Sequence, residues 1–366
     1  MFEKVKKNFG FGCMRLPMVN GEVDTEEFKR MVDHFLEKGF NYFDTAHGYL
    51  DGKSETALKA CLTSRYPIES YVLTDKLSGH HFETEADIRP LFQSQLDACG
   101  VEYFDFYLMH AQNKAKLEKY KACRAYETAF ALKAEGKIRH VGISFHDKAE
   151  VLDEILTTYP AVEVVQIQFN YMDYEDPIVE SRACYEVCRK HNKPVIVMEP
   201  VKGGKLAQMS DDALAVYKEL GEMSPASYAI RFVAGHEGVM MTLSGMGNMD
   251  MMNDNISYMT DFVPFSKEEF AAVDKVREII RETRQIPCTK CDYCAEGCPK
   301  NIPISKVFAV HNDYLAAKIT KHEEKEQLAK LSGKAEDCIK CGKCENICPQ
   351  KIQIRKNLEE IIKKDE

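Results

Sequence analysis

Eight short apolar runs recur along the first 285 residues, separated by longer stretches with the 3.6-residue period of amphipathic helices. The runs are rich in Val, Ile, Tyr and Phe and are apolar at nearly every position, as is typical of strands covered on both faces. Eight strand–helix repeats over this length predict an α/β fold, a closed (β/α)8 barrel of the TIM type. We expect the strands at residues 10–14, 41–45, 71–76, 104–110, 140–144, 162–169, 194–199 and 239–244.

The helix signals agree with this alternation. Residues 25–38 carry one apolar stripe, and Asp24 precedes them as a candidate N-cap. Further helices are expected at 115–133 and 177–190, and three glycines stand where helices should end: Gly39, Gly100 and Gly136. A doubly wound open sheet is the alternative, but it would carry a G-x-G-x-x-G motif after the first strand, and residues 10–13 do not continue into one.

Composition narrows the class of partner. The net charge of −9 argues against a nucleic acid or an anionic membrane as the main partner. Residues 1–20 hold three lysines without a long apolar run behind them, which is unlike a signal peptide. Since the sequence also has no run of roughly 20 apolar residues, we expect a cytoplasmic protein without a membrane span.

Fourteen cysteines are present, and eight of them lie between Cys288 and Cys348. These eight form two copies of C-x2-C-x2-C-x3-C-P, at residues 288–299 and 338–349. In two-cluster ferredoxins the fourth cysteine of each copy binds the other [4Fe–4S] cluster. The expected ligands are therefore Cys288, Cys291, Cys294 and Cys348 for one cluster, and Cys338, Cys341, Cys344 and Cys298 for the second.

Two zinc sites are the alternative, because C-x2-C pairs also bind zinc. Four cysteines with a closing proline, twice over, favour the clusters and resemble bacterial-type ferredoxins. The spacer at 304–333 is charged and helical in pattern, which resembles the α-helical variant of these ferredoxins. We therefore expect a barrel domain at 1–285 and a small α-helical ferredoxin-like domain at 286–366.

Polar residues follow three successive predicted strands. Asp44 and Tyr49 follow the second strand, Lys76 ends the third and His110 ends the fourth. Each alone is commonly a solvated or structural residue, but active sites of such barrels gather at the C-terminal ends of strands. Carbonyl reduction needs a proton donor at the oxygen, and a tyrosine can serve if a nearby cation stabilises its phenolate. Lys76 would supply that cation, Asp44 would fix it, and His110 would orient the carbonyl.

The barrel resembles aldo-keto reductases over nearly its whole length, and the fused cysteine domain resembles the iron–sulfur branch of that family. The matching landmarks are Arg15-Leu-Pro, Phe43-Asp-Thr-Ala, Tyr49, Ser54-Glu55, His110, Val141-Gly-Ile-Ser, Val165-Gln-Ile-Gln-Phe-Asn170 and Glu199-Pro-Val-Lys-Gly-Gly-Lys-Leu206. The resemblance implies reversible reduction of an aldehyde or ketone by NAD(P)H. It also implies Tyr49 as general acid, with Asp44, Lys76 and His110 in the roles above.

The same resemblance implies a nucleotide site. Ser144 and Gln166 would contact the nicotinamide carboxamide, and Met198 takes the place of the aromatic residue that stacks on the ring. The segment 245–255, beginning with Gly245 and Met246, would hold the adenosine phosphate end, with Asp254 and Asn255 near the adenine. The family's Asn after the serine is Phe145 here, and the Arg that grips the NADP 2′-phosphate aligns with Met251. These departures leave NADH and NADPH both open, with a flavin as an alternative cofactor.

Three functions fit these features. The first is an NAD(P)H-linked reductase of a small carbonyl compound or alcohol whose clusters are structural or sensory. In the second, a ferredoxin or flavodoxin partner feeds electrons through the clusters to the barrel site. The third is a cofactor-sensing module without turnover, similar to potassium-channel β-subunits, against which the complete set of four barrel residues speaks.

Overall fold

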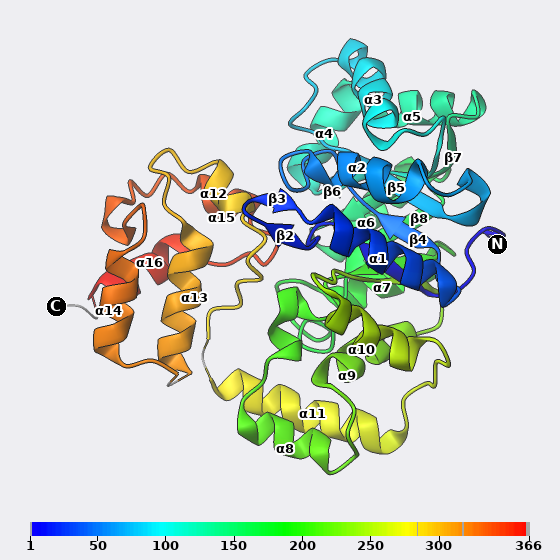
Figure 1. The fold of residues 1–366 in the computed structure, drawn as a ribbon. Coiled ribbons are helices and arrows are strands. Elements are labelled where there is room, and N and C mark those ends of the chain that lie inside the picture. The colour runs from blue at the N-terminus through cyan, green and yellow to red at the C-terminus, as the bar shows by residue number, and fades with distance from the viewer. Residues whose placement is uncertain (1, 284, 317, 364–366) are drawn as a thin grey trace. The chain divides into compact units, whose positions relative to one another are not determined.

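Eight parallel strands close into a barrel in the computed structural model (Figure 1). The strand order is β1-β10-β9-β8-β7-β6-β5-β4, and β1 pairs with both β4 and β10. The predicted (β/α)8 barrel is confirmed, and every strand lies within two residues of its predicted limits. The strands are β1 Phe9–Gly12, β4 Tyr42–Asp44, β5 Val72–Leu77, β6 Phe104–Gln112, β7 Ile138–Phe145, β8 Val164–Gln168, β9 Val195–Met198 and β10 Val239–Ser244.

The structure describes residues 2–283, 285–316 and 318–363, so the outer ends of the two predicted domains, 1 and 366, lie outside the described residues. The chain divides into two compact units. The barrel unit comprises Met1–Pro200 and Ser227–Phe265, and the cluster unit comprises Val201–Ala226 and Ser266–Glu366. A segment between two barrel strands therefore belongs to the cluster unit. Within the described ranges, no helix is both long and apolar enough to cross a membrane.

Helices alternate with the strands in the barrel unit, and Asp24 caps the first by accepting a hydrogen bond from the Glu27 amide. The prediction of one helix over 115–133 is wrong, because Arg124 adopts the left-handed region at φ 51° and divides it. A short hairpin, β2 Met18–Val19 and β3 Glu22–Val23, was not predicted. The helices are α1 Thr25–Glu37, α2 Lys53–Leu58, α3 Glu85–Cys99, α4 Lys114–Ala122, α5 Ala125–Ala134, α6 Ala149–Thr158, α7 Ser181–Lys190, α9 Pro225–Ala234 and α10 Met249–Met259.

The described part of the cluster unit is helical and contains no strand, as the charged pattern of 304–333 indicates. Its core joins apolar side chains such as Phe308 and Leu358 to cysteines of both motifs, including Cys294 and Cys344. Its elements are 3-10 helices η3 Lys202–Ala207 and η4 Ala335–Asp337, with α8 Asp211–Lys218, α11 Lys267–Glu282, α12 Tyr293–Glu296, α13 Ile304–Leu315, α14 Lys321–Ala329, α15 Lys343–Ile347 and α16 Ile354–Lys363.

Large apolar side chains from several strands form a buried cluster, and Tyr42, Phe106 and Ile196 are among them. Gly142 on β7 leaves the room that this packing needs. A Cβ at Gly142 would lie 2.5 Å from Val164 Cγ2 and 2.6 Å from Leu108 Cδ2. It would also lie 2.8 Å from the Val164 carbonyl oxygen, which is backbone and cannot move aside cheaply.

Gly142→Ala is therefore expected to lower the free energy of unfolding by about 1–3 kcal/mol, the usual cost of an overpacked core. Urea unfolding followed by circular dichroism measures this. Gly247→Ala is the control, since a Cβ there would meet only the Arg15 carbonyl oxygen at 3.8 Å. Equal midpoints for the two variants would contradict the packing argument.

Candidate functional site

The four predicted catalytic residues come from three neighbouring strands. Asp44 is the last residue of β4, Lys76 lies near the end of β5, and His110 lies near the end of β6. Tyr49 follows β4 in the loop before α2. Because β4, β5 and β6 are parallel and adjacent, their C-terminal ends meet at one rim of the barrel.

Lys76 is the centre of this group. Its ammonium donates hydrogen bonds to Asp44 Oδ1 and to the Thr45 carbonyl oxygen, both at 2.6 Å. It also lies 3.4 Å from the Tyr49 hydroxyl. The Lys76 and Asp44 side chains are only 1% and 5% exposed, so water screens this ion pair little. Burial raises the pKa of Asp44, while the charge of Lys76 and its hydrogen bond oppose that rise.

His110 completes the group beside Tyr49. Its ring is 6.1 Å from the Tyr49 ring, centroid to centroid, in an edge-on arrangement. Burial lowers the pKa of His110 well below its ordinary value, and the charge of Lys76 lowers it further. The imidazole is therefore neutral at pH 7. Its Nδ1 lies 2.6 Å from the Ser78 hydroxyl, a partner that sequence reasoning missed.

Ser54 and Glu55, at the start of α2, anchor the C-terminal end of the loop that carries Tyr49. The Ser54 hydroxyl donates to the Cys13 carbonyl oxygen at 2.9 Å, which ties α2 to the end of β1. The buried Glu55 carboxylate lies 3.0 Å from His47 Nδ1, and this hydrogen bond raises the pKa of His47. These contacts anchor the residues on both sides of Tyr49 in the sequence, His47 and Ser54.

Two residues predicted to contact the nicotinamide take part in the network of the barrel rim. Gln166 Nε2 donates to Asp44 Oδ2 at 3.1 Å, so Gln166 and Lys76 hold the two oxygens of the same carboxylate. Ser144 Oγ accepts a hydrogen bond from the Ala111 amide at 2.7 Å. Met198 is the last residue of β9. Ser144 and Met198 lie at the C-terminal ends of their strands, and Gln166 lies in the middle of β8.

The predicted phosphate segment leads from β10 into α10. Gly245 and Met246 follow the strand, and the Asn248 side chain caps the helix by accepting from the Met251 amide at 2.9 Å. The Met249 amide donates to the Glu27 carboxylate at 3.1 Å. An acidic side chain of α1 thus already lies at this helix N-terminus. Sequence reasoning missed Glu27, which lies 222 residues away in the chain.

The two predicted adenine contacts, Asp254 and Asn255, lie inside α10. The Asn255 amide nitrogen donates to Ser244 Oγ at 3.0 Å, and its oxygen accepts from the Tyr258 hydroxyl at 2.5 Å. Asn255 is buried, whereas Asp254 is partly exposed. The hydrogen bonds of Asn255 therefore join α10 to β10.

The eight clustered cysteines line two cavities in the cluster unit. One is lined by Cys288, Cys291, Cys294 and Cys348, together with Gln350. The other is lined by Cys298, Cys338, Cys341 and Cys344. Thus each cavity takes three cysteines from one motif and the fourth from the other. Four convergent thiols suit an iron–sulfur cluster or zinc, and all fourteen cysteines are free of disulfides. The six cysteines outside the motifs are buried.

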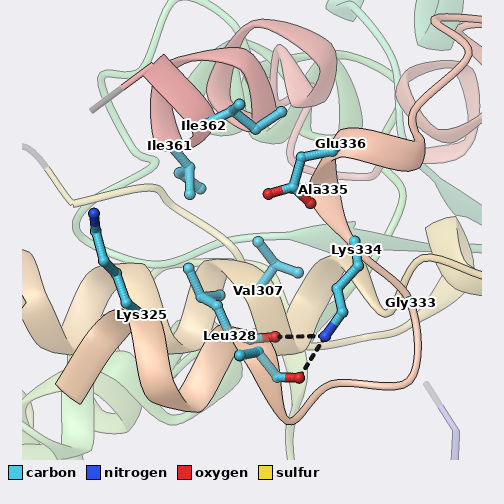
Figure 2. Close-up of a pocket in the computed structure, with 10 residues that line it drawn as sticks. Val307, Lys325, Leu328, Gly333, Lys334, Ala335, Glu336, Ile361 and Ile362 are labelled. Atoms are coloured by element: carbon cyan, nitrogen blue, oxygen red, sulfur yellow. Dashed lines mark hydrogen bonds between the residues drawn. The ribbon is translucent and has the colours of Figure 1, made fainter. Parts of the chain in front are cut away.

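A larger hollow of ≈ 340 Å³ lies between α13, α14 and α16, and no cysteine lines it (Figure 2). Its walls combine apolar side chains, Val307, Leu328 and Ile361 among them, with the charged side chains of Lys325, Lys334 and Glu336. The Lys334 ammonium at its edge donates to the Leu331 carbonyl oxygen at 3.2 Å and to carbonyl oxygens at the end of α14. Lys334 therefore acts as a helix C-terminal partner.

Models of two known families match the two parts of this chain. A model of the aldo/keto reductase family matches residues 8–278. This chain belongs to the aldo/keto reductase family. A model of a 4Fe-4S dicluster domain matches residues 287–353, so an iron–sulfur domain follows the reductase barrel.

Individual relatives have low sequence identity to this chain, but the matches extend over most of its length. An uncharacterized oxidoreductase of Schizosaccharomyces pombe is 24% identical over 284 residues, which are 75% of this chain and 87% of the yeast protein. The 9,11-endoperoxide prostaglandin H2 reductase of Trypanosoma cruzi is 24% identical over 258 residues, 70% of this chain and 84% of its own. An aldo-keto reductase of Klebsiella pneumoniae, solved with NADPH, superposes with a TM-score of 0.60 at 21% identity, covering 74% and 90% of the two chains.

Ser78 yields a test of the site geometry. If His110 is to donate from Nε2, Ser78 must donate to Nδ1, which also favours the neutral ring. We expect Ser78→Ala to lower kcat about tenfold for carbonyl reduction, within the range that misplacing a catalytic group costs. The acidic limb of the kcat/KM profile should move to higher pH.

Ser70→Ala is the control, because the exposed Ser70 hydroxyl bonds only to the nearby Pro67 carbonyl oxygen among the described contacts. A Ser78→Ala enzyme with an unmoved pH profile would show that Ser78 does not set the state of His110.

Proposed function

We propose that this protein reduces an aldehyde or ketone, reversibly, with NAD(P)H, and that Tyr49 is the general acid. The observation that carries the proposal is the buried ammonium of Lys76, 3.4 Å from the Tyr49 hydroxyl and held by Asp44 at 2.6 Å. A free phenol with a pKa near 10 releases its proton reluctantly at pH 7. A cation at this distance in a site screened little by water stabilises the phenolate and so eases that release.

The residues divide the work as follows. A bound nicotinamide would supply the hydride, with Ser144 and Gln166 near its carboxamide. Tyr49 transfers its hydroxyl proton to the substrate oxygen as negative charge develops there. Neutral His110 donates a hydrogen bond to the same oxygen and orients it. Lys76 stays beside the phenolate, and Asp44 keeps the ammonium in place. In the reverse direction, the phenolate takes the alcohol proton.

The two cysteine cavities are proposed to hold two [4Fe–4S] clusters, with the ligand sets given by the cavities, in a domain spanning 286–366 after a barrel domain of 1–285. Thiols that must stay reduced suit the cytoplasm. Electron transfer through the clusters from a ferredoxin or flavodoxin is the second candidate function. It is favoured by the exposure of Cys341, which brings the second cavity to the surface of its unit.

NADH is the proposed nucleotide. In the alignment with the family, the NADP 2′-phosphate lies near the N-terminus of α10, where Arg is replaced by Met251. Here the Glu27 carboxylate already accepts a hydrogen bond from the Met249 amide at the start of that helix. A 2′-phosphate would lie near this carboxylate, which Arg30 pairs on the same helix, and Met251 could not give it the bidentate contact of an arginine. The 2′-hydroxyl of NADH does not need that contact.

Tyr49→Phe tests the reductase function. We expect carbonyl reduction by the cluster-loaded full chain to fall by about 10²–10⁴-fold, because the general acid is lost. The measurement is anaerobic oxidation of NADH or NADPH with a panel of aldehydes and ketones. Tyr66→Phe is the control, since the Tyr66 hydroxyl donates a hydrogen bond to the Asp33 carboxylate, outside the group of Asp44, Tyr49, Lys76 and His110. Undiminished turnover in Tyr49→Phe would overturn the assignment.

Glu27→Gln tests the nucleotide choice. Gln can still accept from the Met249 amide, while the negative charge and its ion pair with Arg30 are lost. We expect the ratio of the NADPH Kd to the NADH Kd to fall two- to fivefold, in line with about 0.5–1 kcal/mol for a charge at a helix N-terminus. Calorimetric titration gives both constants. Glu26→Gln on the same helix is the control, because Glu26 is exposed and pairs with Lys29. An equal change in both variants would contradict a specific role of Glu27.

A further inference from the structure

Gln350 is a buried amide at the wall of the first cysteine cavity. It follows Cys348 and Pro349 directly, and only 6% of it is exposed. Its Oε1 accepts a hydrogen bond from the Lys202 ammonium at 3.0 Å. Its Nε2 is buried without a hydrogen-bond partner among the residues that the structure describes. A buried N–H left without an acceptor costs free energy, so this donor points to an acceptor that binds in the cavity.

Lys202 reaches Gln350 from η3, which lies tightly against the first cysteine motif. Gly203 has φ 64°, and a Cβ there would lie 2.5 Å from the Thr289 carbonyl oxygen. Thr289 stands directly after Cys288. The backbone of η3 therefore packs against the loop that holds this cavity, and the buried Lys202 is fixed with it. The cation in turn fixes which end of the Gln350 amide faces the cavity.

The second cavity lacks this arrangement. The two motifs are equivalent in sequence, and the residue that corresponds to Gln350 is Lys300, which follows Cys298 and Pro299 of the first motif. Lys300 lines the second cavity but is exposed, so water solvates its charge. One cavity thus has a fixed, buried donor backed by a buried cation, and the other has a solvated side chain.

We propose that Gln350, oriented by Lys202, donates a hydrogen bond to the sulfur atoms of the first cluster and raises its reduction potential above that of the second. This rests on the proposed binding of two clusters. Reduction adds one electron and hence one negative charge to a cluster. A fixed N–H donor and a buried cation stabilise the more negative state, and hydrogen bonds to the sulfur atoms are an established means of tuning such potentials. A single electron given to the chain therefore resides on the first cluster.

Potentiometric titration of the full, cluster-loaded chain tests this, with dithionite as reductant and electron paramagnetic resonance as readout. The wild-type protein should show two one-electron transitions. Gln350→Leu should make reduction at the higher transition at least tenfold less favourable, a shift of about 59 mV to lower potential, and leave the other in place. Lys202→Met should shift the same transition in the same direction, because the amide loses its anchor.

Lys300→Gln is the matched control at the equivalent position of the second cavity and should leave both transitions within the error of the wild type. Iron analysis guards against a loss of cluster, since each variant must keep about eight iron atoms per chain. Unshifted transitions in fully loaded Gln350→Leu would overturn the proposal, as would equal shifts in Gln350→Leu and Lys300→Gln. A wild-type protein with only one cluster would instead refute the proposed cofactor content.

Discussion

Closure of the barrel at β1 is the constraint on which the candidate site depends. In register, Gly10 lies opposite Tyr42 of β4 on one side and Leu243 of β10 on the other. A Cβ at Gly10 would lie 2.9 Å from Leu243 Cδ2 and from Met241 Sδ, so a residue without a side chain allows this close approach. With the ring closed and all its strands parallel, their C-terminal ends share one rim. Residues as far apart in the chain as Asp44 and Gln166 then come into hydrogen-bond contact.

Much of this fold could be predicted from sequence because its signals are local. Buried parallel strands leave apolar runs, and a helix end leaves a glycine, as at Gly39, Gly100 and Gly136, each with positive φ. The candidate catalytic group could be selected because strand ends are recognisable and a Tyr–Lys–Asp–His set has a coherent chemistry. The cysteines were informative for a similar reason, since a repeated spacing restricts which thiols can converge.

Other features could not be found in this way, because they depend on packing between distant segments. Ser78 is an ordinary serine until the fold brings it to His110, and Glu27 is one acid among several on α1 until β1 and β10 pair. The division between α4 and α5 at Arg124 could not be predicted from the sequence, because a non-glycine residue rarely adopts a positive φ. The hydrogen bond of Asn255 to Ser244, which joins α10 to β10, likewise depends on how these two elements pack.

The two units alternate along the chain, and this limits how the cluster unit can be exchanged between proteins. The cluster unit is built from two stretches that are separated in sequence. The earlier one, Val201–Ala226, is inserted into the barrel sequence between β9 and β10. A graft of the C-terminal residues alone onto another barrel would leave behind the backbone that lies against Thr289. Recombination at a single point in the chain cannot transfer this unit intact. The iron–sulfur domain and the loop after β9 must therefore be inherited, exchanged or engineered together.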